Sequence, residues 1–205
     1  MIHDVLRLIV NQLNRSLGSS SDGESVVLGN IATVESAGDG GGGGGGAANL
    51  SRVVLSLVNI TEDPTLKNGP HSHLRDGRIV YENRPVNLYL YLLFSANNPV
   101  YSTALTQLSR VIEFFQGQNV FTIRNSPDLV GVSLAADELA GLRIVVELQS
   151  LTFEQVNYLW GSLGGKQVPF VLYRARLISL TAGDIVSSGP PIEEIAVDSF
   201  SAFPP

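Results

Sequence analysis

The sequence predicts an α+β fold, a mixed α/β sandwich in which a mainly antiparallel sheet is covered by about three helices. Stretches with apolar residues at helical spacing alternate with stretches rich in β-formers, in the order α, β, β, β, α, β, β, α, β. The chain has 205 residues, of which 44% are hydrophobic, and this is enough for one core of ordinary size. We therefore expect a domain over residues 1–180 and an extended arm, containing Pro and Gly, over residues 181–205.

The N-terminal part predicts a helix, a strand and an open loop. Ile2 to Leu17 carries apolar residues at i, i+3 and i+4 and is typical of an amphipathic helix. Val26 to Val34 is a predicted strand, interrupted at Gly29–Asn30. The glycine-rich loop 36–49 is expected to be flexible, because glycine loses the most backbone entropy when it is ordered. No Gly-Lys-Ser/Thr follows these glycines, so a phosphate-binding loop is disfavoured.

The middle of the chain predicts the centre of the sheet. Arg52 to Thr61 alternates like a strand, and the Pro and Gly residues of 62–85 indicate a long surface loop. Val86 to Ala96 is apolar on both faces, which is typical of a central strand. Pro99 is expected in the first turn of a helix that covers Tyr101 to Gln116. The buried stripe expected for this helix is Leu105, Leu108, Val111, Ile112 and Phe115.

Two short strands, Asn119 to Arg124 and Leu142 to Leu148, lead into a helix, a glycine turn and a long strand. Thr152 is an N-cap candidate, and Gln155 stands where a capping box needs it. The apolar stripe expected for this helix is Phe153, Val156, Tyr158, Leu159, Trp160 and Leu163. Because the only Trp of the chain lies here, we expect this segment to anchor the core.

Glycines end that helix and a long strand follows. Gly164 and Gly165 can take the positive φ of a helix C-cap. Val168 to Leu180 is rich in β-formers, and within it Arg174 and Arg176 point to the same side.

Charge and composition exclude several function classes. The net charge is −6 and the pI is about 5.0, which argues against nucleic acid or an anionic membrane as the main partner. Only 16% of the residues are charged, and a surface so poor in charge suits a subunit that buries area in an assembly. Cysteine is absent, so disulfides and thiolate metal sites are excluded. No apolar run reaches the ~18 residues of a membrane span, and the N-terminus does not resemble a signal peptide.

Candidate chemical groups are few. His71 and His73 with Asp76 could hold a metal, but incidental histidines on an exposed loop are the favoured interpretation. Glu193 and Glu194 form, with Asp198, a small acidic cluster that we expect to be solvated or to face a basic partner surface. No nucleophile–base arrangement stands out, so we expect no catalytic residues and no cofactor.

Four stretches of the chain are distinctive: IHDVLRLIVNQLN, VVLSLVNITEDPTLKN, PVNLYLYLLFSANNPVYSTALTQLSRVIEFFQGQNVF and FEQVNYLWGSLGGKQVPFVLYRARLI. They resemble the cap, or tube-terminator, proteins of extracellular contractile injection systems, the phage-tail-like particles of the antifeeding-prophage and virulence-cassette type. The resemblance covers about Ile2 to Leu180, apart from the glycine run and part of the 65–85 loop.

The resemblance implies a tail-terminator-like fold and a structural, non-enzymatic role. A hexameric ring of such subunits would end the inner tube and join it to the last sheath ring, with no nucleic acid or membrane as partner. Assembly in the bacterial cytoplasm would precede release of the particle. Two other roles stay open: a ligand-binding, metal-binding or hydrolytic module using the 65–85 loop, and a cargo adaptor of the same particle.

Subunit contacts in such a ring are expected at the C-terminal arm and at the long strand. We expect Ile192 to Val197 to add a strand to a neighbouring subunit. Arg174 and Arg176 would pair with acidic residues such as Glu193 of a neighbour, or would lie on a solvated strand face. The expected interface residues are Arg174, Arg176, Ile192, Glu193, Glu194 and Ile195.

Overall fold

A computed structural model describes the following residues: 2–18, 25–34, 52–64, 72–75, 78–82, 86–127, 131–133, 142–180 and 185–189. The chain forms two compact units, one made of residues 1–62 and 87–178 and the other of residues 63–86 and 179–205. We describe each unit by itself.

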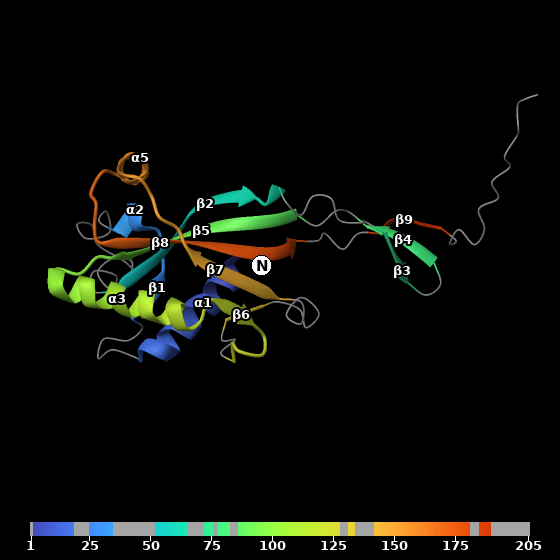
Figure 1. The fold of residues 1–205 in the computed structure, drawn as a ribbon, viewed down its shortest axis with the longest axis horizontal. Coiled ribbons are helices and arrows are strands. Elements are labelled where there is room, and N and C mark those ends of the chain that lie inside the picture. The colour runs from blue at the N-terminus through green and yellow to red at the C-terminus, as the bar shows by residue number, and fades with distance from the viewer. Residues whose placement is uncertain are drawn as a thin grey trace, which may run out of the picture. The chain divides into compact units, whose positions relative to one another are not determined.

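The first unit is built on a six-stranded sheet with the order β1-β2-β5-β8-β7-β6 (Figure 1). Its strands are β1 Val26–Leu28, β2 Val53–Glu62, β5 Val86–Ala96, β6 Val120–Thr122, β7 Arg143–Leu148 and β8 Phe170–Leu180. β1 runs parallel to β2, while the pairs β2–β5, β6–β7 and β7–β8 are antiparallel. The hydrogen bond from Ala96 N–H to Pro169 C=O (2.9 Å) joins the end of β5 to the start of β8, so these strands also run antiparallel. The mainly antiparallel sheet predicted from sequence is thus confirmed.

Helices cover both faces of this sheet. In the described residues they are α1 Ile2–Leu17, α2 Ile31–Val34, α3 Tyr101–Gly117 and α5 Phe153–Ser162. α1 and α3 pack on one face and enclose the larger apolar core, which contains an edge-to-face aromatic contact between Phe94 and Phe115. α2 and α5 pack on the other face around Trp160, and they lie toward one end of it (Figure 1). The sheet therefore has one face covered by two long helices and another that is only partly covered.

β5 shows why the alternating apolar pattern predicted a central strand. Leu90, Leu92 and Phe94 enter the larger core, whereas Leu93 enters the smaller cluster around Trp160. Successive side chains of a strand point to opposite faces, so a strand with apolar residues at both parities must lie between two covered faces. β5 is indeed flanked by β2 and β8, and the prediction is confirmed.

The ends of α5 also follow from sequence. Thr152 Oγ1 accepts from Gln155 N–H at 3.3 Å, and Gln155 Oε1 accepts from Thr152 N–H at 3.0 Å, which completes the predicted capping box. At the other end Gly164 and Gly165 take φ of +106° and +85°, a conformation that side chains with a Cβ strain to adopt. Gly165 N–H then donates to Trp160 C=O at 2.7 Å and closes the last turn.

The predicted strand over Val26 to Val34 is wrong after Leu28, because the chain turns there into α2. The Ser56 hydroxyl donates to Gly29 C=O at 2.8 Å and accepts from Ile31 N–H at 3.0 Å. This side chain of β2 satisfies backbone groups that would otherwise continue the strand ladder. The sequence alone does not reveal that Ser56, 25 residues after Ile31, bonds the backbone at this point.

The start of α3 also differs from the prediction. Pro99 precedes the N-cap residue Val100, so it stands outside the first turn, and no side chain caps the helix. Asn98 Oδ1 accepts instead from Val100 N–H at 2.9 Å and shapes the turn before the helix.

The second unit contains a three-stranded antiparallel sheet with the order β3-β4-β9. Its strands are β3 Ser72–Arg75, β4 Arg78–Glu82 and β9 Ile185–Gly189. The expectation of a plain surface loop over 62–85 is therefore wrong at β3 and β4. Residues 36–49 and 192–197 lie outside the described residues, so the flexible glycine loop and the arm stay predictions.

Candidate interaction surfaces

The partly covered face of the sheet carries three arginines with a tyrosine and a glutamate, which we call the arginine face: Tyr89, Arg143, Glu147, Arg174 and Arg176. The register of β7 and β8 brings the charged residues of these two strands next to one another on this face. Glu147 is paired with Arg174 and Val145 with Arg176 across β7 and β8, and the intervening Ala175 points into the larger core. Because side chains alternate along a strand, the predicted common side of the two arginines is confirmed.

Arg174 is held by two contacts within its own subunit. Its Nη2 lies 2.7 Å from Glu147 Oε2, and its guanidinium carbon lies 4.9 Å from the centre of the Tyr89 ring. The hydrogen bond to Glu147 raises the pKa of Arg174 above its ordinary value, so the guanidinium stays charged. The Arg174 and Glu147 side chains remain 35% and 57% exposed, so a partner protein can still reach both.

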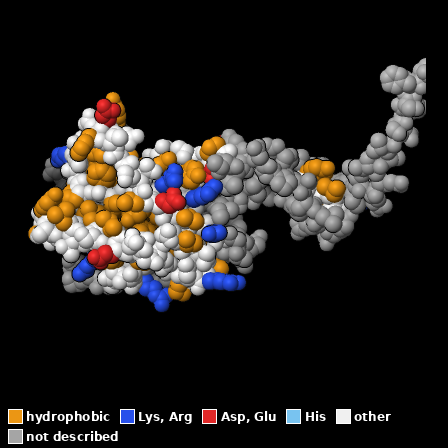
Figure 2. All heavy atoms as spheres, viewed as in Figure 1, with side chains coloured by type: hydrophobic (Ala, Val, Ile, Leu, Met, Phe, Trp, Pro, Cys, Tyr) orange, Lys and Arg blue, Asp and Glu red, His pale blue; other side chains and the backbone are white. Residues whose placement is uncertain are grey.

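Arg176 and Arg143 make the arginine face basic. The guanidinium carbon of Arg176 lies 5.9 Å from the centre of the same Tyr89 ring, and Arg143 is exposed at the start of β7. Figure 2 shows basic side chains gathered with hydrophobic ones over β7 and β8, beside an acidic group. Three arginines and one glutamate give this face a positive charge, although the whole chain has a net charge of −6. Sequence pointed to Arg174 and Arg176, but Tyr89 and Glu147 became visible only through strand register.

A second candidate surface is apolar and lies on α3. The helix buries Ala104, Leu108, Val111 and Phe115 against the sheet. Leu105 and Ile112, expected in the buried stripe, are instead 45% and 43% exposed. Tyr101 is 66% exposed, and it precedes Leu105 by one helical turn. We call Tyr101, Leu105 and Ile112 the α3 stripe, and Figure 2 shows hydrophobic side chains gathered along this helix and the neighbouring end of the sheet.

The α3 stripe continues into a hollow at the end of β7. This hollow has a volume of about 340 Å³ and is lined by residues that include Ile112, Phe115 and Leu148. Leu148 itself is 59% exposed. A run of exposed apolar side chains beside a hollow is typical of a protein–protein contact. Sequence missed this surface because the spacing of Leu105 and Ile112 fits a buried helical stripe equally well.

α5 presents two further exposed aromatic side chains. Phe153 and Tyr158 were expected in the apolar stripe of this helix, but they are 96% and 75% exposed. Trp160 is the buried residue of α5, and Leu159 and Val156 pack beside it. The predicted anchoring role of Trp160 is confirmed for the smaller apolar cluster, while Phe153 and Tyr158 face outward.

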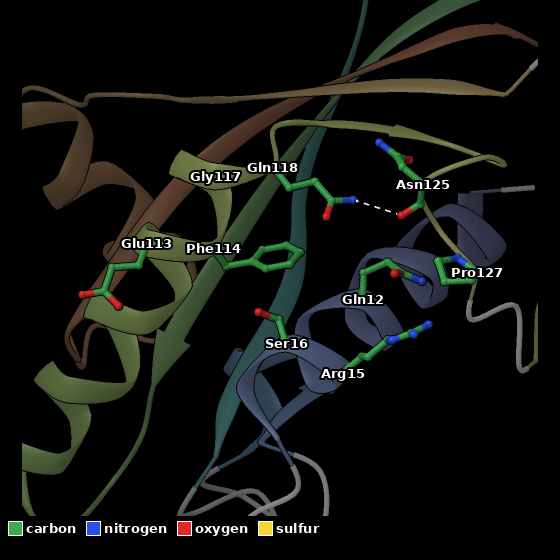
Figure 3. Close-up of a pocket in the computed structure, with 9 residues that line it drawn as sticks. All are labelled: Gln12, Arg15, Ser16, Glu113, Phe114, Gly117, Gln118, Asn125 and Pro127. Atoms are coloured by element: carbon green, nitrogen blue, oxygen red, sulfur yellow. Dashed lines mark hydrogen bonds between the residues drawn. The ribbon is translucent and has the colours of Figure 1, made fainter.

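The ends of α1 and α3 border a polar hollow of about 630 Å³, shown in Figure 3. The Phe114 ring lies in the middle of the view, with the side chains of Ser16, Gln12 and Gln118 around it. Gln118 Nε2 donates to the main-chain carbonyl of Asn125 at 3.4 Å, which ties the end of α3 to the turn after β6. The residues lining it do not form a nucleophile–base pair, so we assign no chemistry to it.

Several predicted site residues lie outside what the structure describes. These are Ile192, Glu193, Glu194 and Ile195, together with His71 and Asp76. His73 belongs to β3, but its side chain is likewise not described. Among the described residues no three His, Cys, Asp or Glu side chains are grouped to hold a metal ion. In the same part of the chain, no helix has both the length and the apolar character needed to span a membrane.

Comparison with known proteins identifies the family. The model of the Pvc16 N-terminal domain family matches residues 4–194. The chain belongs to this family. No curated protein matches the sequence of this chain.

Two solved structures are similar to this chain. One is the cryo-EM structure of the sheath/tube terminator, in the extended state, of PVC, an extracellular contractile injection system. The present chain matches it with a TM-score of 0.59 at 15% identity, over 99% of this chain and 65% of that chain. The chain thus spans somewhat less than two thirds of that terminator. A second is the tube-terminating cap of the anti-feeding prophage, matched with a TM-score of 0.49 at 15% identity over 72% of this chain and 49% of that chain. The fold is therefore that of a tube terminator of contractile injection systems, as the sequence resemblance predicted.

Proposed function

We propose that this chain is a cap, or tube-terminator, subunit of a contractile injection system. Six copies form a closed ring that ends the inner tube and joins it to the last sheath ring. The observation that carries this proposal is the family match over residues 4–194, supported by a fold shared with a sheath/tube terminator. The ring assembles in the bacterial cytoplasm, becomes part of the released extracellular particle, and turns over no substrate.

The two exposed surfaces of the first unit supply different kinds of contact for such a ring. Subunits of a closed ring meet through heterologous interfaces, so one patch of a subunit contacts a different patch of the next. The α3 stripe offers apolar area, including Leu105 and Ile112, that a neighbouring subunit would bury. The arginine face offers a positive surface for an acidic partner, because its charge is opposite to that of the chain as a whole.

The acidic partner of the arginine face is the C-terminal segment of a neighbouring subunit. Glu193 and Glu194 are adjacent in the sequence, so in an extended segment their carboxylates point to opposite sides. One of the two carboxylates would reach Arg176 and the exposed side of Arg174, while the segment 192–197 adds a strand to the neighbour. Arg174 keeps its contact with Glu147 in the same subunit, so it contributes only part of its hydrogen-bonding capacity.

Particles assembled without this protein test the proposed role. Tubes of irregular length that lack a terminal cap would support a terminator. Intact but empty particles would refute it and would favour a cargo adaptor. A label on this chain, imaged in complete particles, should appear at one end of the tube.

Removal of residues 181–205 tests the C-terminal contact. We expect the six-stranded sheet of the first unit to fold without this segment, because all six of its strands lie outside residues 181–205. The three-stranded sheet would lose β9, and the shortened chain is expected to lose the ring in mass photometry. Unchanged rings and unchanged particle assembly would rule out the strand exchange while leaving the terminator role intact.

A further inference from the structure

The six-stranded sheet ends in two short edge strands, β1 and β6. An edge strand has outward-pointing N–H and C=O groups that can pair with a strand of another molecule. Along an edge strand, the residues whose backbone bonds the neighbouring strand alternate with residues whose N–H and C=O point outward. The backbone hydrogen bonds to the neighbouring strand therefore identify the outward groups. Val146 N–H donates to Asn119 C=O on the β7 side, and so Val120 and Thr122, one and three residues further on, present their backbone groups outward.

The side chain of Asn125 occupies these outward groups of β6. Its Oδ1 accepts from Thr122 N–H at 2.7 Å, and its Nδ2 donates to Val120 C=O at 2.7 Å. Asn125 is placed there by the turn that follows β6, in which its own N–H donates to Thr122 C=O at 3.2 Å. Gln118 holds the main chain of Asn125 from the other side, as Figure 3 shows. One carboxamide thus supplies the donor and the acceptor that a neighbouring strand would supply.

β1 has the same arrangement at the opposite edge. Ser25 C=O accepts from Val53 N–H, and Gly29 N–H donates to Leu55 C=O, so the alternate residue Val26 faces outward. The Asn14 carboxamide, from α1, accepts from Val26 N–H at 2.8 Å and donates to Val26 C=O at 2.8 Å. Both edges are therefore closed by an asparagine: Asn14 comes from α1, and Asn125 comes from the turn directly after β6.

We propose that Asn14 and Asn125 mimic a neighbouring strand and so prevent the edges of the six-stranded sheet from pairing with another molecule. A carboxamide suits this task because it carries one acceptor and two donors in the geometry of a peptide group. Neighbouring subunits then contact this sheet through side-chain surfaces, and the sheet does not continue from one copy to the next, so a strand added by segment 192–197 of a neighbour would pair outside this sheet. This inference concerns the isolated chain and holds whether or not the chain forms a ring.

Hydrogen exchange of backbone amides tests the closure directly. In Asn125→Ala the amide of Thr122 should exchange at least about fivefold faster, and in Asn14→Ala the amide of Val26 should do so, because each loses its acceptor. In Asn125→Asp the carboxylate still accepts from Thr122 N–H, so this amide should stay protected. Asn157→Ala, at an exposed position of α5, is the matched control and should leave both amides unchanged.

Association of the same variants tests the consequence. With its edges open, Asn14→Ala or Asn125→Ala should form β-rich assemblies that bind thioflavin T at concentrations where the control does not. If Asn125→Ala does not fold, the exchange of the Val26 amide and the association of Asn14→Ala test the proposal at the β1 edge. Unchanged exchange of Thr122 and Val26, or association no greater than that of Asn157→Ala, would overturn the proposal.

Discussion

Replacing Arg174 with alanine is expected to lower the free energy of unfolding only slightly while removing a contact needed for assembly. The ion pair with Glu147 is short, 2.7 Å, but both side chains are at least one third exposed. A pair with such exposure contributes about 0.2–1 kcal/mol. The guanidinium over Tyr89, with 4.9 Å between its carbon and the ring centre, adds about 0.5–1 kcal/mol. The expected loss is therefore about 0.7–2 kcal/mol.

A double-mutant cycle separates the ion pair from the contact with Tyr89. Arg174→Ala, Glu147→Ala and the double variant should give a coupling energy of about 0.5 kcal/mol at low salt. This coupling should fall in 1 M salt, where charges are screened beyond about 3 Å. Urea unfolding followed by the fluorescence of Trp160 measures all variants. Arg124→Ala, which removes an exposed arginine elsewhere, serves as the control.

Two results would contradict this reasoning. A coupling energy above about 2 kcal/mol, unchanged by salt, would mean that the pair behaves as a buried one. An Arg174→Ala variant that forms rings as readily as Arg124→Ala would mean that the arginine face does not contact a neighbour. Loss of rings with the stability nearly intact is the expected outcome.

Three further predictions concern the α3 stripe, the smaller apolar cluster and the acid limit of stability. Changing Leu105 and Ile112 together to Gln should leave the unfolding free energy within about 0.5 kcal/mol, since both side chains are exposed, but should abolish rings in mass photometry. Trp160→Ala should cost about 3–5 kcal/mol, because Trp160 is only 4% exposed, whereas Trp160→Phe should cost less; urea unfolding followed by circular dichroism measures both. The pKa of Asp4 is lowered by a hydrogen bond to the N-terminal amino group and by the N–H of Ser133, so its stabilisation is present above its ordinary pKa and is lost as the pH falls below it. Thermal unfolding between pH 6 and pH 3 should therefore show a smaller acid-induced loss for Asp4→Asn.

Local patterns explain which elements could be predicted from sequence. The helix predicted over Ile2 to Leu17 coincides with α1, because its apolar spacing and its contacts both repeat at the helical period. The capping box at Thr152 involves atoms three residues apart, so sequence contains all of it. β3 and β4 were missed because the Pro and Gly residues around them indicated a loop, and because the third strand of their sheet, β9, follows more than 100 residues after β4.

The candidate surfaces could be predicted only in part. The common side of Arg174 and Arg176 follows from strand alternation, but the position of Tyr89 next to them depends on how β5 and β8 are placed in the sheet. Leu105 and Ile112 directly follow the buried residues Ala104 and Val111, and one position corresponds to a rotation of about 100° around the helix. The rotation of α3 on the sheet, and not the composition of the helix, decides which side it exposes.

The sequence by itself determined the period of each main helix and strand, the caps of α5, the centre of the sheet and, through resemblance, the family. These features depend on neighbours within a few residues or on whole stretches of the chain. The tertiary structure alone decided which apolar side chains remain outside and which carboxamides close the sheet edges. Such properties depend on distances between segments such as Asn14 and Val26, and residue types do not report those distances until the chain has folded.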